Sequence, residues 1–383
     1  MIKAVPADFI VEEKADLPLR QRGAYRAYLL KKSGWNTLDL LHFLSRSLAL
    51  PLSRFSYGGK KDKHGLTSQF IAIREAEDFS RRGKNFVLTS LGFMDRPMAP
   101  DLIAGNAFTV TIRNIEHLDL IEKSAEEVKK TGFPNFFDDQ RFRGYDPERG
   151  FFGEKILRRH WNGALKIYLT SARDDDGKRE RERKNALFQN WKDWPSCLGM
   201  AEDRLEKKIF RYLVEHPKNS VEALHFIPQE EISMQYAAFQ SHLWNEVLRR
   251  LIRQKVKQVE EVEGKEGEYL FWGKIQEGPR HYLLGLEIPT AAVKMDWADD
   301  FTRSIYEQTL KERGLRAESF RTKALHKAYF RSVLRRAVII PDDLRVGGSG
   351  EDELHSGKKK LTLSFILPRG AYGTMLIKRL SLN

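Results

Sequence analysis

Residues 106–115 read NAFTVTIRNI, and this stretch has the clearest strand pattern in the chain. Phe108, Val110 and Ile112 alternate with polar side chains, which is typical of a strand with one buried and one solvated face. Residues 359–368, KKLTLSFILP, alternate in the same way near the other end of the chain. We therefore expect strands from both ends of the chain to build one sheet.

Shorter patterns add further elements around this sheet. Residues 24–32 and 69–74 read as strands, and residues 337–341 as a short buried strand. A helix is expected to begin near Asn36 or Thr37, with one of these side chains capping its first turn. Another helix is expected over about residues 118–130, before Gly132. Residues 345–360, RVGGSGEDELHSGKKK, read as a mobile loop.

The middle of the chain has helical periodicity instead. Residues 232–252, ISMQYAAFQSHLWNEVLRRLI, place their large apolar side chains on one helical face. Residues 172–185 read as a solvated loop followed by an exposed helix start, and residues 260–270 as a charged connector. The expected fold class is α+β. A mixed-sheet domain, residues 1–150 and 335–383, is interrupted by a mainly helical insertion, residues 151–334.

The composition limits the class of protein. The 383 residues include 66 lysines and arginines against 53 acids, for a formal net charge of +13. This balance favours a polyanionic partner, nucleic acid before a membrane surface; a merely basic protein is the alternative. The single cysteine, Cys197, excludes an internal disulfide and a cysteine-rich zinc site. No apolar signal core or membrane-spanning stretch is found, and we expect a cytoplasmic, monomeric protein.

The common cofactor motifs are missing from the sequence. It contains no GxxxxGKS/T, GxGxxG, HExxH or GxSxG pattern, and its histidines do not fall at metal-ligand spacing. ATP, NAD and zinc chemistry are therefore not expected. We expect a reaction carried by side chains alone, with no cofactor and no metal.

Residues 57–69, YGGKKDKHGLTSQ, place one carboxylate, Asp62, in a run of cations. A solvated basic turn is one interpretation. The other is a held, ionised carboxylate that acts as a nucleophile or electrostatic stabiliser at a sugar carbon, with the lysines contacting phosphates. The glycines of the run are expected to permit backbone conformations closed to other residues and to let a ligand approach: Gly58, Gly59 and Gly65.

Residues 132–144, GFPNFFDDQRFRG, interleave four phenylalanines with amides and guanidiniums. Such a set suits an extruded RNA base, because rings stack on it, amides read its edges and cations hold phosphates. A hydrophobic core segment with a polar rim is the alternative interpretation.

These two segments resemble the TruD family of pseudouridine synthases. The first matches the family pattern GxKDxxxxTxQ at Gly59, Lys61, Asp62, Thr67 and Gln69, and the second is similar to the family's PN-aromatic-F-x-x-QRFG. Other stretches have family counterparts in the same order along the chain: KAVPADFIVEE, SGWNT, GNAFT, AAFQSHLWNE, RRAVIIP and FILPRGAYGT. The resemblance covers nearly the whole chain.

The resemblance implies a reaction on RNA. A uridine is flipped out, its C1′–N1 bond is broken, the uracil rotates, and its C5 is joined to C1′, without cofactor or metal. Asp62 would be the essential aspartate, either adding to C1′ or assisting its deprotonation. Phe137 would stack on the uracil, and Asn135 would lie near the active site. Lys3 or Lys61 would form an ion pair with Asp62.

The resemblance also extends the expected site. Gln69, Gln140 and Arg141 complete the substrate-binding set, and Gln69 and Thr67 are expected to buttress the loop. The implied fold is the pseudouridine-synthase fold, a mixed, largely antiparallel sheet flanked by helices, with a TruD-type insertion and the RNA cleft between. Three matched residues of the insertion would either face RNA or hold their helix: Gln240, Ser241 and Asn245.

This chain departs from the family pattern at three places. The segment before GNAF carries few cations, QRFG is QRFRG with Arg143 inserted, and residues 378–380 read KRL where the family has Arg-Glu-Leu. None of these changes touches Asp62. They bear on which RNA is bound more than on the reaction.

The target is less defined than the reaction. Bacterial members act on the uridine at position 13 of certain tRNAs, which is the expected target. Residues 170–230 look longer than in the shortest bacterial members, as in archaeal and eukaryotic relatives, so another tRNA, rRNA or mRNA uridine is the alternative. The competing classes are a non-catalytic RNA-binding protein or chaperone on a synthase scaffold, and a glycosidase with paired carboxylates.

Overall fold

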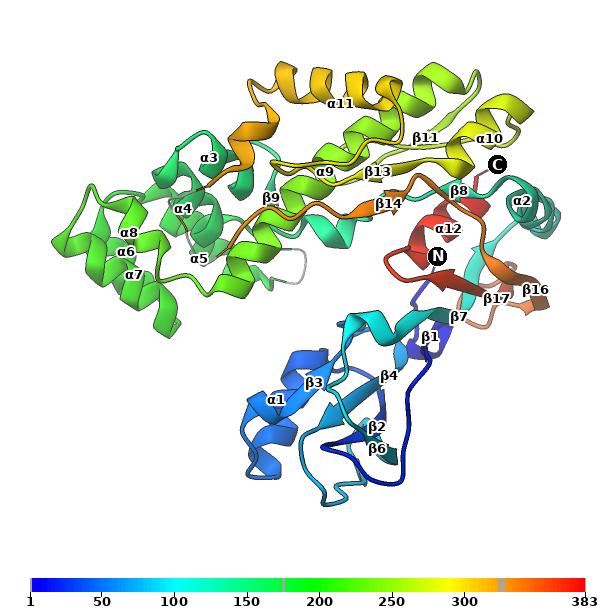
Figure 1. Cartoon of the computed structure of the whole chain (residues 1–383), viewed down its shortest axis with the longest axis horizontal. Coiled ribbons are helices and arrows are strands. Elements are labelled where there is room, and N and C mark those ends of the chain that lie inside the picture. Colours follow the sequence, from blue (N-terminus) through cyan, green and yellow to red (C-terminus); the bar gives the residue numbers. More distant parts are fainter. Residues whose placement is uncertain (1, 174–175, 323–324, 326–327, 383) are drawn as a thin grey trace. The chain divides into compact units, whose positions relative to one another are not determined.

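The structure, a computed structural model, describes residues 2–173, 176–322, 325 and 328–382. The chain divides into two compact units, Met1–Phe133 with Ile339–Asn383, and Pro134–Val338 (Figure 1). The first unit thus contains both ends of the chain. These units change after Phe133 and after Val338, whereas the sequence predicted domain boundaries after 150 and after 334. The segment after Phe133 is hydrogen-bonded to the 335–337 segment within the second unit.

The first unit is built on one mixed sheet in the order β16-β17-β7-β1-β4-β2-β6-β5, with β3 paired to β4. β1 and β4 run parallel, and the other neighbours are antiparallel. β7 pairs with both β1 and β17, so strands from both ends of the chain are adjacent, and the α+β class with a largely antiparallel sheet is confirmed. The strands are β1 Phe9–Ala15, β2 Tyr25–Lys32, β3 Phe55–Tyr57, β4 Leu66–Ile73, β5 Arg81–Gly83, β6 Phe86–Met94, β7 Ile103–Ile115, β16 Asp342–Glu351 and β17 Lys359–Pro368.

Helices cover the apolar side chains of this sheet. Leu40, Leu41 and Leu44 of α1 (Thr37–Ser47) are buried with side chains of β2 and β4. α12 (Gly373–Leu380) begins directly on β7, where a Cβ added at Gly373 would lie 3.0 Å from the ring of Phe108. The predicted helix before Gly132 is confirmed as α2 (Leu118–Thr131), which ends at this glycine with φ 69°.

The predicted mobile loop at residues 345–360 is wrong. Most of its first half belongs to the edge strand β16, whose pairing with β17 shifts register between Val346 and Ser349. Asp352, 5% exposed, then accepts hydrogen bonds from Arg113 and from the backbone of Asn114, both at 2.8 Å. Glycines permit such an irregular edge strand, and a buried ion pair anchors the turn after it, so a loop-like composition was misleading.

The second unit is mainly helical. The predicted helix at 232–252 is confirmed as the long, largely buried α9 (Gln229–Lys255). The charged stretch at 172–185 contains the start of α5 (Lys178–Gln189), and its residues 174–175 lie outside the described residues. The other helices are α3 Phe152–Leu157, α4 Trp161–Thr170, α5 Lys178–Gln189, α6 Trp194–Met200, α7 Arg204–Glu215, α8 Ser220–Leu224, α10 Glu277–Gly285 and α11 Asp300–Glu312.

Short strands complete the second unit. The expected charged connector at 260–270 is instead a hairpin of β11 (Glu260–Val262) and β12 (Tyr269–Phe271). β13 (Glu287–Pro289) pairs with β14 (Leu334–Arg336), and β9 (Tyr145–Asp146) pairs with β10 (Gly150–Phe151). The chain passes between the units within β8 (Phe133–Pro134) and β15 (Val338–Ile339).

Candidate active site

The loop that carries Asp62 connects β3 to β4 in the first unit. One carboxylate oxygen of Asp62, Oδ2, forms an ion pair with the Lys3 ammonium. The other, Oδ1, accepts a hydrogen bond from the backbone N–H of His64 at 2.9 Å. The Asp62 side chain is 20% exposed. The segment is therefore not a freely solvated turn, because its carboxylate is held in place and remains accessible.

The ion-pair partner of Asp62 is Lys3 and not Lys61. The Lys61 ammonium donates a hydrogen bond to Asn106 Oδ1 at 2.6 Å and pairs with Glu13 Oε1 at 2.7 Å. The side chain of Glu13 is fully buried, so Lys61 supplies its countercharge. The choice that the sequence left open is thus decided by the fold, which brings β1 and β7 to the base of the loop.

The environment of Asp62 sets its protonation. Burial raises the pKa of this carboxyl, but the hydrogen bond and charge of Lys3 and the N–H of His64 lower it by more, so the net pKa lies below its ordinary value. Lys3 is itself fixed, since its ammonium lies 4.1 Å from the centroid of the Phe9 ring and its backbone has φ 63°. Asp62 is therefore ionised at neutral pH.

Lys32 holds the backbone of the same loop, a role that no sequence pattern indicated. It lies at the end of β2 and is 4% exposed. Its ammonium donates to the carbonyls of Trp35 and Asp62 at 2.8 Å each, and to that of Lys61 at 3.4 Å. Burial lowers the pKa of Lys32 to about 8, while Asp62 acts to raise it and Lys61 to lower it. A buried ammonium thus fixes the position of Asp62 through its main chain.

Gln69 and Thr37 support the loop from β4 and α1. Gln69 is fully buried; its Oε1 accepts a hydrogen bond from the Thr37 hydroxyl at 2.9 Å, and its Nε2 donates to the Gly59 carbonyl at 3.4 Å. The Thr37 hydroxyl accepts from the backbone N–H of Lys61 at 2.9 Å. Gln69 therefore buttresses the loop, and its contact with substrate stays a prediction. The predicted side-chain cap at the start of α1 is wrong, because the Asn36 amide donates to Asp39 Oδ2 at 2.9 Å and the Thr37 hydroxyl is used here.

The glycines of the loop are needed for close packing and not for an unusual backbone. Gly58, Gly59 and Gly65 are absent from the positions with positive φ. An added Cβ would lie 2.1 Å from the Ile103 side chain at Gly58 and 2.4 Å from the Phe9 carbonyl oxygen at Gly65. At Gly59 it would meet no described atom within 4 Å. The expected special conformations are therefore wrong, and Gly59 is the one of the three with open space around it.

Asn135 lies in the second unit and is 3% exposed. Its side-chain oxygen accepts a hydrogen bond from Arg335 at 2.6 Å, and its Nδ2 donates to a main-chain carbonyl of β14 at 2.9 Å. Its backbone N–H donates to the carbonyl of Ala337 at 2.8 Å. Both ends of this amide are engaged within the chain, so Asn135 holds the segment that presents the next aromatic residues.

Phe137 is held through its backbone and its ring. Its N–H donates to Asn245 Oδ1 at 2.8 Å and its carbonyl accepts from Asn245 Nδ2 at 2.9 Å. The Arg335 guanidinium lies 4.1 Å from the ring centroid, and the Trp244 ring packs against it in a T-shaped arrangement with the centroids 5.5 Å apart. Asn245, for which RNA contact and helix support were both open, thus positions Phe137.

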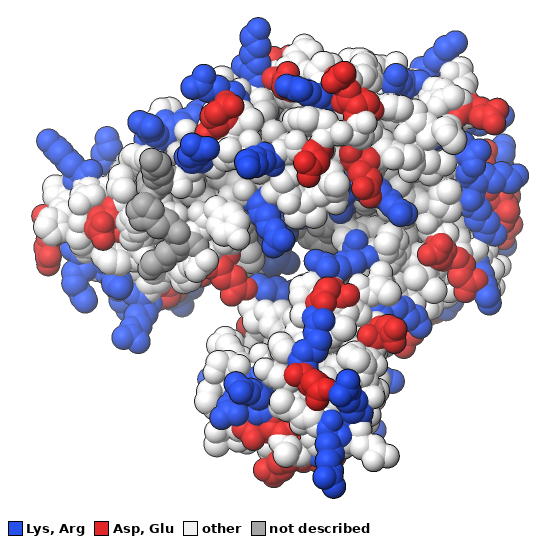
Figure 2. Space-filling model, in the orientation of Figure 1, with Lys and Arg blue, Asp and Glu red and all other residues white. Residues whose placement is uncertain are grey.

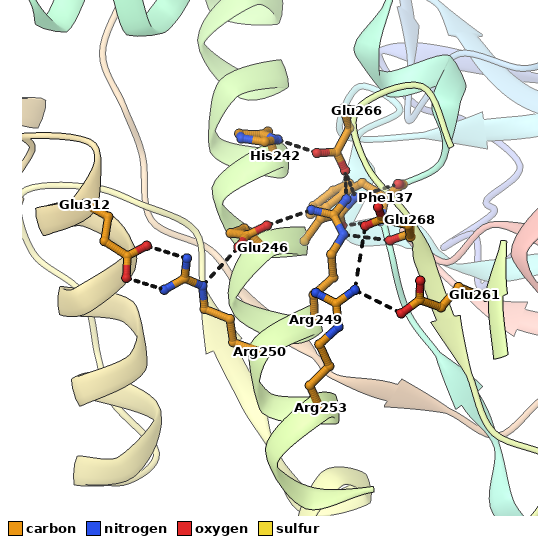
Figure 3. Close-up of polar contacts among 11 residues, drawn as sticks. Phe137, His242, Glu246, Arg249, Arg250, Arg253, Glu261, Glu266, Glu268 and Glu312 are labelled. Atoms are coloured by element: carbon orange, nitrogen blue, oxygen red, sulfur yellow. Dashed lines mark hydrogen bonds and ion pairs between the residues drawn. The ribbon is translucent and has the colours of Figure 1, made fainter. Parts of the chain in front are cut away.

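A buried ionic network supports Asn245, and Figure 3 shows its charged members Glu266, Arg249 and Glu246. Glu266 accepts hydrogen bonds from Asn245 at 2.8 Å and from Arg249 at 2.5 Å, and it contacts the His242 ring. Arg249 also pairs with Glu246 at 3.0 Å. Sequence reasoning missed Glu266, because it stands in a charged run where nothing distinguishes a buried acid from a solvated one.

Gln140 and Arg141 lie on the short turn Asp139–Phe142 of the second unit. Arg141 donates to the Ser241 hydroxyl at 3.1 Å, and its guanidinium lies 5.7 Å from the centroid of the Phe137 ring. Gln140 is exposed. The fold therefore brings Arg141 to Phe137 and leaves Gln140 at the surface, where contact with RNA stays a prediction.

The surface of both units is rich in cations. Figure 2 shows lysines and arginines spread across the visible face, with acids interspersed. Within the described ranges, no group of three or more His, Cys, Asp or Glu side chains is arranged to hold a metal ion. Nor does any described helix combine the length and apolarity needed to cross a membrane.

Comparison with solved structures identifies the class of fold. The crystal structure of the putative tRNA pseudouridine synthase D from Methanosarcina mazei matches this structure with a TM-score of 0.71. The match covers 100% of this chain and 93% of the other, at 24% sequence identity. The two chains therefore share one fold.

Comparison with known sequences narrows this class. Residues 1–380 match the family model for tRNA pseudouridine synthase D (TruD). The tRNA pseudouridine synthase D of Leptospira interrogans is 31% identical over 393 residues, covering 100% of this chain and 96% of that protein. A probable tRNA pseudouridine synthase D of Methanocaldococcus jannaschii is also 31% identical, covering 99% and 90%. The chain belongs to the TruD family.

Proposed function

We propose that this protein isomerises a uridine of tRNA to pseudouridine, with Asp62 as the catalytic carboxylate. The observation that carries this proposal is the state of Asp62, which is ionised by its pairing with Lys3 yet 20% exposed. Membership of the TruD family supplies the class of reaction. An ionised, accessible carboxylate is the group that attack at a sugar carbon requires.

The reaction balances without a co-reactant. When the C1′–N1 bond breaks, its electron pair stays on N1 and the uracil leaves as an anion. Asp62 either bonds to C1′ or takes the proton from C2′. After the uracil rotates, C5 bonds to C1′. In the first case the bond between Asp62 and C1′ breaks, and in the second Asp62 returns the proton to C2′. C5 then loses its proton, and N1 gains one. Because product and substrate are isomers, no oxidant, reductant or activated donor is consumed.

The other site residues take supporting roles in this proposal. Lys3 keeps Asp62 ionised and in place through their ion pair. Lys61 holds the loop through its ion pair with Glu13. Phe137 stacks on the extruded uracil. Asn135 and Gln69 hold the segments that carry these groups. Gln140, which is exposed, and Arg141 contact the RNA backbone or the base edges.

The target within RNA is proposed from the family alone. We infer a tRNA substrate, with the uridine at position 13 as the first candidate, and therefore action in the cytoplasm. The bacterial and the archaeal relative are equally similar to this chain, at 31% identity each, so their similarity favours neither target range. Mapping pseudouridine in cellular RNA with and without this protein would identify the uridine.

The substitution Asp62→Asn tests the catalytic assignment. We expect it to lower the single-turnover rate of pseudouridine formation in a tRNA transcript, assayed without added cofactor, by at least about a thousandfold. The Kd for tRNA should change by less than about threefold, because Asp62 makes no favourable contact with phosphate. Asp101→Asn, which removes an exposed carboxylate of the same unit, is the control. Wild-type turnover by the Asp62 variant would remove Asp62 from the mechanism.

A further inference from the structure

Arg335 lies directly against the ring proposed to stack on the uracil. Its guanidinium carbon is 4.1 Å from the centroid of Phe137 and 5.1 Å from that of Trp244. A guanidinium in this position makes a cation–π contact with the ring. Phe137 is 9% exposed, and the Arg141 guanidinium also lies near its ring, 5.7 Å from the centroid. Because Arg335 is the nearer cation and covers the face that it contacts, a base that stacks on this ring must take a face that Arg335 leaves open.

The guanidinium is fixed by the chain itself. Its Nε and Nη2 donate to the main-chain carbonyl of Asn135 at 3.1 and 2.6 Å, and Nη2 also donates to Asn135 Oδ1 at 2.6 Å. Because these donors are used on the segment that leads to Phe137, the cation is preorganised behind the ring. An arginine also keeps its charge across the accessible pH range.

The proposed reaction gives this cation a role. An aromatic ring carries partial negative charge on its faces, so a neutral uracil stacks on it more readily than an anionic one. The uracil becomes an anion when the C1′–N1 bond breaks, and the stack would then turn unfavourable. A cation on the far face of the ring offsets this repulsion at the step where charge develops.

We propose that Arg335 is a positioning residue that acts through Phe137, backing the ring with positive charge so that it can hold the detached, anionic uracil. This inference rests on the proposed function. Because the charge on the uracil appears only during the reaction, Arg335 should affect the chemical step more than tRNA binding. It should also lose its effect when the aromatic ring is absent.

The first experiment compares Arg335→Gln, Arg335→Lys and Arg336→Gln by single-turnover rate and by Kd for a tRNA transcript. Arg336 is the matched control, because it lies on the same strand with a side chain that is 67% exposed. We expect Arg335→Gln to slow the reaction about tenfold with Kd within about twofold. Arg335→Lys should be at least about threefold faster than the Gln variant, because it keeps the charge. Arg336→Gln should react at the wild-type rate.

A double-mutant cycle with Phe137→Leu separates action through the ring from general support of the fold. Arg335→Gln should slow the Phe137→Leu protein by less than about twofold, although it slows wild type about tenfold. Equal slowing in both backgrounds would overturn the inference. Tighter tRNA binding by Arg335→Gln would also overturn it, because it would show that the Arg335 side chain occupies the place where the base stacks. Thermal unfolding of each variant confirms folding. If the Gln variant does not fold, the same cycle is run with Arg335→Lys, whose effect on the rate should likewise be smaller in the Phe137→Leu protein than in wild type.

The two hypotheses fail in different ways. If the wild-type protein forms no pseudouridine in tRNA, the proposed function is wrong and this inference falls with it. If wild type is active and Arg335→Gln is as fast, only the inference is wrong.

Discussion

Three lysines around the β3–β4 loop show how the fold gives each positive charge its own partner. Lys3 pairs with Asp62, Lys61 pairs with the buried Glu13, and Lys32 binds main-chain carbonyls. Each ammonium therefore has its own acceptor, although all three lie close to one loop. This division keeps one carboxylate, Asp62, both ionised and accessible, while the other is neutralised inside the unit.

Replacing Lys3 should change the pH dependence of the reaction. In Lys3→Met, burial is left to raise the pKa of Asp62, opposed only by His64 among the stronger influences, so the carboxyl titrates at higher pH. The acid limb of the single-turnover rate, measured from about pH 4 to about pH 9, should move to higher pH. Lys63→Met, which removes an exposed charge from the same loop, is the control. Superimposable profiles for Lys3→Met and wild type would contradict this prediction.

Lys32 should produce an alkaline limb in the same profile. Its pKa is lowered to about 8 by burial, so above that pH the amine is neutral and holds the Asp62 carbonyl less strongly. Lys32→Arg, which stays charged, should shift the limb to higher pH. Between pH 8 and the ordinary lysine pKa the unfolded chain binds more protons, so this group makes the protein more stable as pH rises. Thermal unfolding over the same pH range can therefore distinguish a loosened loop from loss of the fold. An alkaline limb that is unchanged in Lys32→Arg would show that another group produces it.

At the scale of secondary-structure elements, the hairpin β11–β12 completes the long helix α9. The connection within this hairpin carries Glu266, whose carboxylate meets Asn245 and Arg249 of the helix (Figure 3). The same helix fixes the backbone of Phe137 through Asn245. A short hairpin thus helps to hold Phe137 in place, because its Glu266 fixes the Asn245 side chain that binds the Phe137 backbone.

Glu266→Gln should destabilise the protein strongly. It leaves the buried Arg249 without its main countercharge, which costs about 3 kcal/mol in the free energy of unfolding, measured by urea denaturation. Glu261→Gln is the matched control from the same hairpin, because Glu261 forms an exposed ion pair with Arg253 at 3.0 Å and should cost less than about 1 kcal/mol. Equal effects of the two substitutions would show that the network around Glu266 does not stabilise the fold.

At the scale of the whole molecule, positive charge is the property that both units share. The net charge of +13 is spread among many lysines and arginines, and a number of these pair with surface acids (Figure 2). Such a distribution favours a polyanion through many weak phosphate contacts and not through one deep pocket.

The affinity for tRNA should therefore depend steeply on salt. Titrations at several salt concentrations should give a straight line of log Kd against log salt, with a slope of at least about 3. This corresponds to the release of several counterions from RNA phosphates. Asp62→Asn should show the same slope as wild type, because it removes no phosphate contact. A slope near zero would contradict the view that the cations bind the RNA backbone.

The sheet was predictable because its signal is local. Alternation in residues 106–115 and 359–368 reports which face of each strand is buried, and both strands are found in the structure. The edge strand β16 was not, since its glycines and charges look like a loop until β17 supplies the pairing. Boundaries after Phe133 and after Val338 also depended on pairing between distant segments.

The amino-acid sequence by itself determined the fold class, the family and the candidate residues Asp62 and Phe137, because these follow from local periodicity and ordered motifs. Tertiary structure alone decided that Lys3 and not Lys61 pairs with Asp62, that Lys32 holds the loop, and that Glu266 is buried. The physical reason is that the role of a charge depends on which opposite charge or carbonyl lies within hydrogen-bond distance and on how much water is excluded. Both conditions arise only when segments far apart in the chain are packed together.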